Sequence, residues 1–254
     1  MVIAAPPAFQ EKVFVITGAS RGIGEACARA LALQGAKLTL VARSGTALEA
    51  LSAQLHQQGC TKPQVIEADL TQNCAKTADD LIARTVAHWG HLSGLINNAG
   101  SAPRIGLLQE MTEEAITQTF ALNTLAPLYC MRAALRQFAQ QSGVAAGGDI
   151  LNINSVAGKT AYPYWAVYDA SKFALRALTD AVADEARQSG VRVMGIYPGA
   201  VATAIWDGLD MAQAPNRKGM LTPEQVAEAA LFMLRQSPES FLPELTLTPL
   251  KPAL

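Results

Sequence analysis

Tyr168 and Lys172 are the residues whose types and spacing most clearly allow joint chemistry. Residues four apart lie on one face of a helix, so a phenol and an ammonium there can act on the same substrate atom. A free tyrosine, with a pKa of about 10, is a poor base near neutrality unless a neighbouring positive charge lowers that pKa. The pair predicts proton transfer at a substrate oxygen. The alternative is an ordinary solvated helix face, and Ser155 upstream argues against it.

A glycine-rich turn, TGASRGIG over residues 17–24, suits a phosphate ligand. It follows the β-branched run Val13–Thr17 and precedes a helical pattern. Glycines at 18, 22 and 24 let the backbone approach a pyrophosphate at a helix N-terminus. The spacing departs from G-x-G-x-x-G, because three residues follow the first glycine. We predict a dinucleotide-binding turn, and a loose glycine triplet in a plain turn is the alternative.

The end of the second expected strand favours a phosphorylated dinucleotide. Ala42 and Arg43 stand where an acidic residue would bind the ribose hydroxyls of NAD. Arg43, with Arg21 inside the glycine turn, offers guanidinium groups to a 2′-phosphate. We therefore predict NADP(H) as the cofactor, with NADPH preferred over NADH. Exposed arginines without a role are the alternative.

Two further strand ends carry polar residues. Asp69 either accepts a hydrogen bond from the adenine amino group or caps the following helix. Asn97-Asn98-Ala99-Gly100 ends the fourth expected strand, where asparagine amides bond both backbone and cofactor.

Strand and helix patterns alternate along the chain, which predicts a parallel sheet with right-handed crossovers. The expected strands are Val13–Thr17, Lys37–Val41, Gln64–Ala68, Leu92–Asn97, Asp149–Asn154, Arg192–Ile196 and Glu244–Thr248. The expected helices are Ile23–Gln34, Thr46–Gln58, Ala75–Trp89, a region Thr112–Gln140 bent near Asn123–Pro127, about Tyr164–Gln188, and Pro223–Arg235 after a Thr222 cap. With no internal repeat or linker, residues 1–254 are expected to form one domain.

Composition narrows the class of partner. Twenty basic and 21 acidic residues give a formal charge of −1 with no block of like charges, which argues against nucleic acid and favours a small molecule. The four scattered cysteines predict free thiols in a reducing compartment, and the three histidines share no ligand spacing, so no metal site is expected. No apolar run approaches the roughly 18 residues of a membrane span, and we expect a cytoplasmic protein.

Two irregular stretches, about 101–110 and 200–221, follow expected strands and are either walls of the substrate site or ordinary surface loops. The aromatic group at 162–165, with Trp206 and Met211, suggests an apolar or acyl-bearing carbonyl substrate. Core packing or a subunit contact explains the same residues equally well. Arg104 either receives a carboxylate or is solvated.

Taken in order, TGASRGIG, NNAG, Asn123, Ser155, YDASK and YPGAVAT resemble the motifs of the short-chain dehydrogenase/reductase family over nearly the whole chain. Twelve residues separate Ser155 from Tyr168. The resemblance implies a single-domain α/β fold, a Rossmann-like doubly wound sheet of seven parallel strands in the order 3-2-1-4-5-6-7 with helices on both faces. It also implies a homodimer or homotetramer.

The resemblance implies catalytic roles as well. Tyr168 protonates the carbonyl oxygen during reduction, and Ser155 hydrogen-bonds that oxygen. Lys172 binds the nicotinamide ribose and lowers the tyrosine pKa, and Asn123 holds a water that links the lysine to solvent. A strand-end cap at Ser155 and a helix kink at Asn123 are the alternatives. The implied cofactor contacts are Gly18, Ser20, Arg21, Gly22, Ile23, Gly24, Arg43, Asp69, Leu70, Asn98, Ala99, Gly100, Tyr168, Lys172, Pro198, Gly199, Val201 and Thr203.

The sequence therefore predicts an NADPH-dependent oxidoreductase that moves a hydride between the nicotinamide and a carbonyl or secondary alcohol. A 3-oxoacyl or 3-oxoacid reductase and a broad-specificity ketone and aldehyde reductase both fit. A redox-sensing protein that binds the dinucleotide without turnover is the alternative, and the intact set of Ser155, Tyr168 and Lys172 argues against it.

Overall fold

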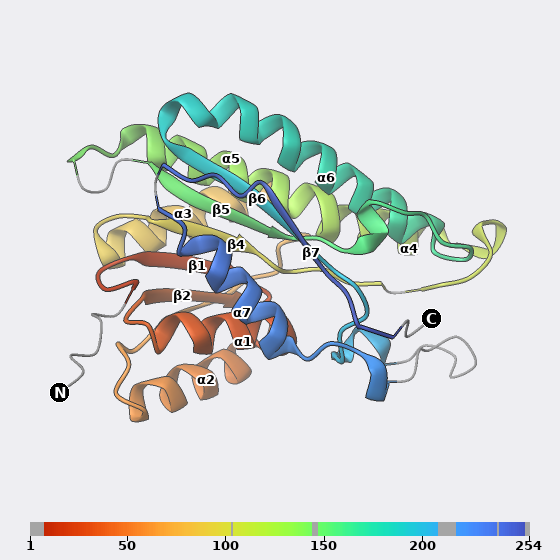
Figure 1. Ribbon diagram of the computed structural model, residues 1–254, viewed down its shortest axis with the longest axis horizontal. Coiled ribbons are helices and arrows are strands. Elements are labelled where there is room, and N and C mark those ends of the chain that lie inside the picture. The colour runs from red at the N-terminus through yellow and green to blue at the C-terminus, as the bar shows by residue number, and fades with distance from the viewer. Residues whose placement is uncertain (1–7, 103, 144–146, 208–216, 238, 252–254) are drawn as a thin grey trace.

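Seven strands form one parallel sheet in the order β3-β2-β1-β4-β5-β6-β7, as the sequence predicts (Figure 1). The structure is a computed structural model that describes residues 8–102, 104–143, 147–207, 217–237 and 239–251. The strands are β1 Val13–Thr17, β2 Lys37–Ala42, β3 Gln64–Glu67, β4 Gly94–Asn97, β5 Gly148–Ile153, β6 Val191–Pro198 and β7 Glu244–Leu247. β1 pairs with both β2 and β4, so the chain reverses its direction of winding between β1 and β4.

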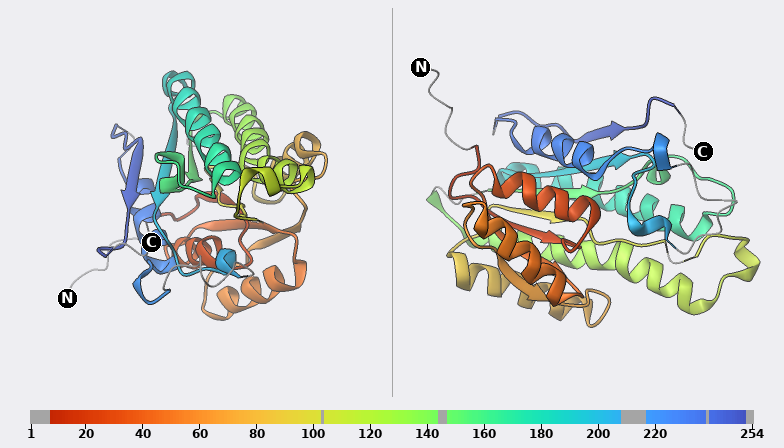
Figure 2. Two further views of the ribbon diagram at one scale, coloured as in Figure 1. Left: turned by 90° about the vertical axis from the view of Figure 1, so that its right-hand side faces the viewer. Right: turned by 90° about the horizontal axis from the view of Figure 1, so that it is seen from below.

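Helices cover both faces of this sheet (Figure 2). They are α1 Gly22–Ala32, α2 Gly45–Gln57, α3 Cys74–Trp89, α4 Glu113–Phe120, α5 Ala126–Gln140, α6 Ala166–Ala186 and α7 Pro223–Leu234. α1 packs beside α7 on one face, and α3 packs beside α5 on the other. Within the described residues no helix is both long and apolar enough to cross a membrane.

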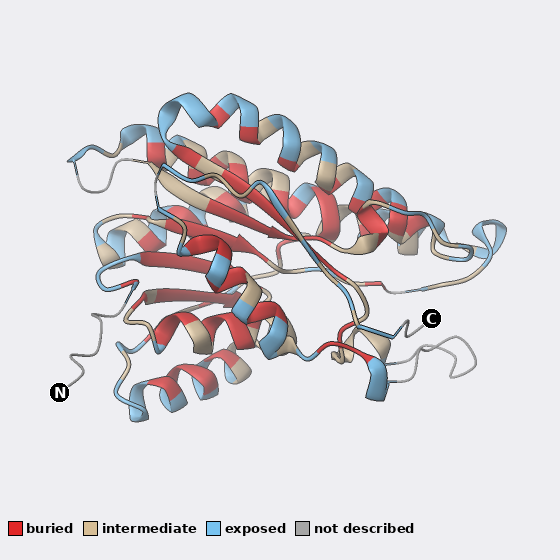
Figure 3. Ribbon diagram, viewed as in Figure 1, coloured by how far each residue is buried: buried red, intermediate tan, exposed pale blue. Residues whose placement is uncertain are grey.

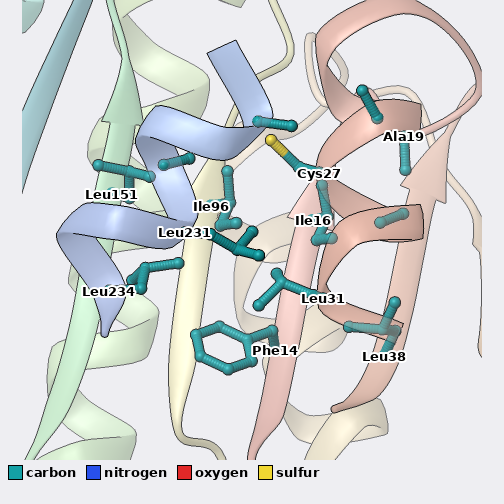
Figure 4. Close-up of a cluster of buried hydrophobic side chains, with 14 of the residues drawn as sticks. Phe14, Ile16, Ala19, Cys27, Leu31, Leu38, Ile96, Leu151, Leu231 and Leu234 are labelled. Atoms are coloured by element: carbon teal, nitrogen blue, oxygen red, sulfur yellow. The ribbon is translucent and has the colours of Figure 1, made fainter. Parts of the chain in front are cut away.

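The core is split by the sheet into two apolar clusters. Phe14 and Ile16 of β1 point to the α1 and α7 side, whereas Val15 between them points to the α3 and α5 side. This alternation follows from the period of two along a strand. Figure 3 shows the central strands β1 and β4 as buried and the edge strand β7 as largely unburied, and Figure 4 shows Phe14 and Ile16 beside Leu31 of α1 and Leu231 of α7. The two clusters fix the strands whose ends carry the polar residues.

The expected helix over 112–140 is divided in three. A π-helical turn, Ala121–Leu125, lies between α4 and α5, with the backbone N–H of Ala126 donating to the carbonyl of Ala121. Pro127 has no N–H and cannot make the bond to position 123 that an α-helix requires. The bend predicted near Asn123–Pro127 is therefore a wide turn.

Boundaries of other elements, among them α6, β4 and β6, differ from the predicted ones by a few residues. α6 begins at Ala166 because Tyr164 has a φ of 72°, which the helix excludes, and residues 187–189 form a 3-10 turn. β4 begins at Gly94, after Ser93 accepts a hydrogen bond from the Val13 N–H with its side chain. β6 extends to Pro198, since its last residues pair with β7.

We expect truncation of a core leucine to destabilise the fold while truncation of a neighbouring exposed leucine does not. Leu31 is fully buried, and Leu33 at the end of the same helix is 62% exposed. Leu31→Ala should lower the free energy of unfolding by about 2–5 kcal/mol, and Leu33→Ala should change it by less than about 0.5 kcal/mol. Urea unfolding measures both. Equal effects would contradict the assigned packing.

Candidate active site

A cleft of about 750 Å³ opens at the carboxyl ends of the strands, where β1 and β4 diverge. The strands point to the right-hand side of Figure 1, and the loops after β4, β5 and β6 gather there. The predicted site residues that line the cleft are Gly18, Ser20, Arg21, Gly22, Ile23, Arg43, Asp69, Leu70, Asn98, Ala99, Gly100, Ser155, Tyr168, Lys172, Pro198, Gly199, Val201 and Thr203. Gly24 and Asn123 are the two that do not.

The glycine turn is built for close backbone approach. Gly18 has a φ of 64°, and a Cβ there would lie 2.9 Å from the Ala99 Cα. Gly22 has a φ of 60° and faces Thr203, so that a Cβ there would lie 3.3 Å from the threonine Cγ2. Both positions need glycine for backbone conformation, and Gly18 needs it for space as well. The turn therefore has a fixed, narrow shape.

Gly24 packs the start of α1 against the glycine turn, and its contact with the cofactor stays a prediction. It is buried in the first turn of α1, and a Cβ there would lie 2.4 Å from both the Gly18 carbonyl oxygen and the Asn98 Nδ2. No side chain fits between the helix and the turn. The missing side chain thus brings α1 against the turn rather than toward the cleft.

The N-terminus of α1 is suited to an anion. Arg21 occupies the N-cap position with extended backbone and makes no side-chain cap, so the first N–H groups of the helix have no side-chain acceptor. Gly22 and Ile23 of this first turn line the cleft. These features fit a pyrophosphate.

Arg21 and Arg43 flank the same end of the cleft. Within the described residues neither arginine forms an ion pair with a carboxylate, and Ser44, which follows Arg43, caps α2 by accepting from the Ala47 N–H. Two guanidinium groups, neither in an ion pair within the described part of the chain, provide a positively charged end to the cleft. This arrangement fits a 2′-phosphate better than two ribose hydroxyls.

Asp69 does not cap α3, which was one of its two expected roles. Its Oδ1 accepts from the Thr71 N–H at 2.9 Å and from the Thr71 hydroxyl at 2.7 Å, while Asn73 holds the N-cap position of α3. Burial acts to raise the pKa of Asp69, but the two bonds from Thr71 and the charge of Arg43 outweigh it, and the pKa is lowered. Asp69 stays ionised beside the cleft.

Ser155 and Tyr168 meet across the cleft. Ser155 follows β5, and its Oγ accepts from the Ala157 N–H at 3.1 Å, so it does cap the short turn behind it. The Ser155 side chain also lies near the phenol of Tyr168, in the first turn of α6, and acts to lower the pKa of that phenol. The strand end and the helix therefore bring two hydroxyl groups to one point.

Lys172 lies one helical turn beyond Tyr168 and is buried. Its Nζ donates to the Ile153 carbonyl at 3.2 Å and lies 5.8 Å from the centroid of the Tyr168 ring. Burial lowers the pKa of Lys172 to about 8. The predicted approach of the ammonium to the phenol is present, although the ammonium bonds to the backbone.

The structure does not show the lowered pKa of Tyr168 that the sequence predicts. Burial raises the pKa of Tyr168 to about 12, the hydrogen bond with Ser155 opposes this rise, and the Asp169 carboxylate adds to it. The Lys172 ammonium bonds to the Ile153 carbonyl and does not reverse the cost of burying a phenolate. Tyr168 consequently keeps its proton at physiological pH.

Asn123 lies in the π-helical turn, beneath Gly100 and beside Lys172. Its amide exchanges two hydrogen bonds with the Ser101 backbone, at 2.8 and 2.9 Å, and donates to the Ser171 hydroxyl at 3.1 Å. A Cβ on Gly100 would lie 3.3 Å from the Asn123 Oδ1 and 3.7 Å from the Lys172 Nζ. Asn123 thus ties the loop after β4 to the helix that carries the lysine.

The expected walls are only partly present. Of the described residues in the loop at 101–110, Ser101 and Ala102 line the cleft, and Arg104 is exposed outside it. From the second loop, residues 200, 201 and 203–207 line the cleft, whereas Met211 is outside the described residues. The Trp165 ring packs edge-on against Tyr168 at 5.6 Å and against Trp206 at 5.7 Å between centroids. An aromatic wall therefore stands beside the phenol.

Comparison with known proteins identifies the family of this chain. The family model for short chain dehydrogenases matches residues 12–214. The chain belongs to the short-chain dehydrogenase family.

Relatives of this short-chain dehydrogenase cover almost all of it. An uncharacterized oxidoreductase of Staphylococcus epidermidis is 32% identical over 243 residues, which is 94% of this chain and 98% of the relative. A metagenomic short-chain oxidoreductase solved in complex with NADP is 30% identical with a TM-score of 0.80, covering 95% and 99% of the two chains. An alcohol dehydrogenase from the archaeon Thermococcus sibiricus, complexed with 5-hydroxy-NADP, is 32% identical with a TM-score of 0.83, covering 93% and 95%.

The structure of this dehydrogenase also shows polar residues that the sequence patterns do not single out. The Thr17 hydroxyl accepts from the N–H groups of Asn98 and Ala99 at 3.0 and 3.1 Å. Asn152 accepts from Asn97 and donates to Thr179 of α6, both at 2.9 Å. Asn152 is polar within the otherwise apolar stretch Ile150–Ile153, and this feature of the sequence could have indicated a buried hydrogen-bond partner. These bonds fix β4, β5 and α6 relative to one another.

Among the described residues, no cluster of three or more His, Cys, Asp or Glu side chains could hold a metal ion. The four cysteines, Cys27, Cys60, Cys74 and Cys130, are free thiols, as predicted.

The buried Lys172 should make stability depend on pH. Its pKa is about 8 in the folded dehydrogenase and 10.5 for an ordinary exposed lysine, so between these values the unfolded chain binds more protons and stability rises with pH. Relative to Lys172→Met, the wild type should gain about 1–2 kcal/mol between pH 7.5 and 9.5. Urea unfolding at both pH values measures the difference, in which the titration of Tyr168 cancels. A pH-independent difference would rule out a lysine that loses its proton in this range.

Proposed function

We propose that this short-chain dehydrogenase is an NADPH-dependent reductase that converts a carbonyl compound to an alcohol, with Tyr168 as the proton donor. The observation that carries the proposal is that Ser155 and Tyr168 line one cleft, close enough for the serine to affect the pKa of the phenol, with Lys172 buried behind them. Two hydroxyls at one point can hold a single carbonyl oxygen. A protein that only senses the dinucleotide has no use for such a pair.

The protonation states favour reduction. Bound NADPH would supply the hydride. Tyr168, with a pKa raised to about 12, keeps its proton at neutral pH and can donate it from the phenolic oxygen to the carbonyl oxygen. Ser155 would donate a hydrogen bond to the same oxygen and polarise the carbonyl. Alcohol oxidation needs the phenolate, which burial disfavours.

Lys172 assists proton transfer from Tyr168 through its positive charge. Below about pH 8 it carries a positive charge 5.8 Å from the ring centroid of Tyr168, and this charge stabilises the phenolate left by proton transfer. Asn123 would hold the backbone around the lysine and keep a water within its reach. The positive charge is needed after the transfer, so it stabilises the product state of Tyr168.

The preference for NADPH rests on Arg21 and Arg43 at the far end of the cleft and on the missing acid after β2. Two solved relatives are complexed with NADP or 5-hydroxy-NADP, which supports the same choice. We assign the pyrophosphate to the N-terminus of α1, and the nicotinamide carboxamide to the Val201 backbone and the Thr203 hydroxyl.

Tyr168→Phe tests the proton donor. Removal of the hydroxyl should lower kcat for ketone reduction by about 100-fold or more, because general acid catalysis contributes at least this much. The dissociation constant for NADPH, measured by fluorescence titration, should change far less than kcat. Tyr164→Phe is the matched control, since Tyr164 is 53% exposed and does not line the cleft. Retained turnover would remove Tyr168 from the mechanism, and a wild type that binds NADPH but reduces no carbonyl would favour the sensor.

Arg43→Ala and Arg21→Ala test the cofactor preference. Each should lower kcat/KM for NADPH by about tenfold or more, because a charge-assisted bond to the 2′-phosphate contributes about 1.5–3 kcal/mol. The value for NADH should change little. Arg104→Ala, which alters an exposed arginine outside the cleft, should behave as wild type. Comparable wild-type kcat/KM values for the two cofactors would refute the preference.

A further inference from the structure

The aromatic wall beside Tyr168 is more than a chance gathering of rings. Trp165 and Trp206 are half-buried and line the cleft with Tyr162, Val156 and Ile205. Trp165 lies between the other two rings, 5.6 Å from Tyr168 and 5.7 Å from Trp206. A ring of the substrate that packs against Trp165 would therefore lie next to the proton donor.

Hydrogen bonds hold this wall in place. The buried carboxylate of Asp169, next to Tyr168 on α6, accepts from the Tyr162 N–H at 2.6 Å. The Trp165 N–H donates to the Tyr162 carbonyl at 3.2 Å, and the Trp165 carbonyl accepts from the Asp169 N–H at 2.8 Å. On the opposite side, the Trp206 indole N–H donates to the Val201 carbonyl at 2.7 Å. Both indole rings are thus positioned by the segments that carry the catalytic and cofactor-facing residues.

The charges around the wall disfavour an anionic substrate. Among the described cleft residues that flank Tyr168, the charged ones are Lys172 and Asp207. Lys172 is buried and bonded to Ile153, and Asp207 is acidic and paired with Arg217 at 2.8 Å. Arg104, the cation that the sequence offers to a carboxylate, is exposed and outside the cleft. A carboxylate bound here would lose water without gaining a cationic partner.

We propose that the substrate is an uncharged carbonyl compound with an aromatic ring near the reacting carbon, and that Trp165 is a specificity-determining residue that packs against this ring. The inference rests on the proposed reductase activity and separates two expectations of the sequence, because it favours a neutral ketone or aldehyde over a 3-oxoacid. A C–H bond forms at the carbonyl carbon and an O–H bond at its oxygen. The C=O π bond breaks, NADPH is oxidised to NADP⁺, and the proton comes from Tyr168.

Four α-keto compounds separate charge from ring: ethyl benzoylformate, benzoylformate, ethyl pyruvate and pyruvate. We expect kcat/KM for ethyl benzoylformate to exceed the values for benzoylformate and for ethyl pyruvate by about tenfold or more each. Absorbance of NADPH gives the rates. Quenching of protein fluorescence by each compound, in the presence of NADPH, gives binding independently of turnover.

Trp165→Leu identifies the ring contact. It should reduce the preference for ethyl benzoylformate over ethyl pyruvate by about tenfold, because the ring loses its packing partner while the shared carbonyl keeps Ser155 and Tyr168. Phe232→Ala is the control, since Phe232 is 54% exposed on α7 and outside the cleft, and it should leave both values unchanged. A second substitution, Ile205→Arg, places a cation in the wall. It should reduce the ratio of kcat/KM for ethyl benzoylformate to kcat/KM for benzoylformate.

The outcomes distinguish this inference from the proposed function. Turnover of benzoylformate equal to that of its ester, or a ring preference that Trp165→Leu leaves intact, would overturn the inference while the reductase activity stands. Absence of turnover with all four compounds, together with tighter binding of ethyl benzoylformate, would overturn the reductase activity and support the inference. Absence of both turnover and preferential binding would overturn both.

Discussion

The side-chain amide of Asn98 holds together the place on which the rest of the site depends. Its Nδ2 donates to the carbonyls of Thr17 and Gly18, both at 3.0 Å, and so joins the end of β4 to the turn after β1. The sheet reverses its winding between these two strands, and this bridge adds to the bonds that the Thr17 hydroxyl accepts from the N–H groups of Asn98 and Ala99. α1 can then pack against the bridge only because Gly24 has no side chain. The shape of the nucleotide end follows from one amide and the glycines that surround it.

A second constraint is the burial of Tyr168 and Lys172 together. Burial disfavours the charged form of each, so it moves their pKa values apart, to about 12 for the phenol and about 8 for the ammonium. Each group is then mostly in the form that carbonyl reduction needs at neutral pH: the phenol protonated, and the ammonium still charged below its lowered pKa. The fold loses stability by burying the ammonium and recovers part of it through the bond to Ile153. Burial of these two groups thus favours the protonation states that carbonyl reduction needs.

Much of this arrangement could be predicted from the sequence, and the part that could not has physical reasons. The parallel sheet follows from the alternating patterns, and the strand order and the meeting of Ser155 with Tyr168 follow from the resemblance to the family. The packing of Gly24 against the turn at Gly18 is not predicted, because sequence alone does not distinguish a glycine that faces a ligand from one that faces a neighbouring turn. The raised pKa of Tyr168 is not predicted, since the i and i+4 spacing places the lysine correctly but does not report where its ammonium bonds. Asn152 and Asp169 are not predicted because their partners lie on elements distant in sequence or in the adjoining turn.

The π-helical turn at Ala121–Leu125 has a consequence beyond the placement of Asn123. One extra residue in a turn rotates everything before it by about 100° relative to everything after it, so the apolar stripes of α4 and α5 do not lie on one line. α5 accordingly packs on the sheet and against α3, while α4 is turned toward α6. The two helices therefore pack against different partners. The π-helical turn between them also holds the loop after β4, through the bonds between Asn123 and Ser101. Removing one residue from the turn would rotate α4 by about 100° relative to α5 and so turn α4 away from α6.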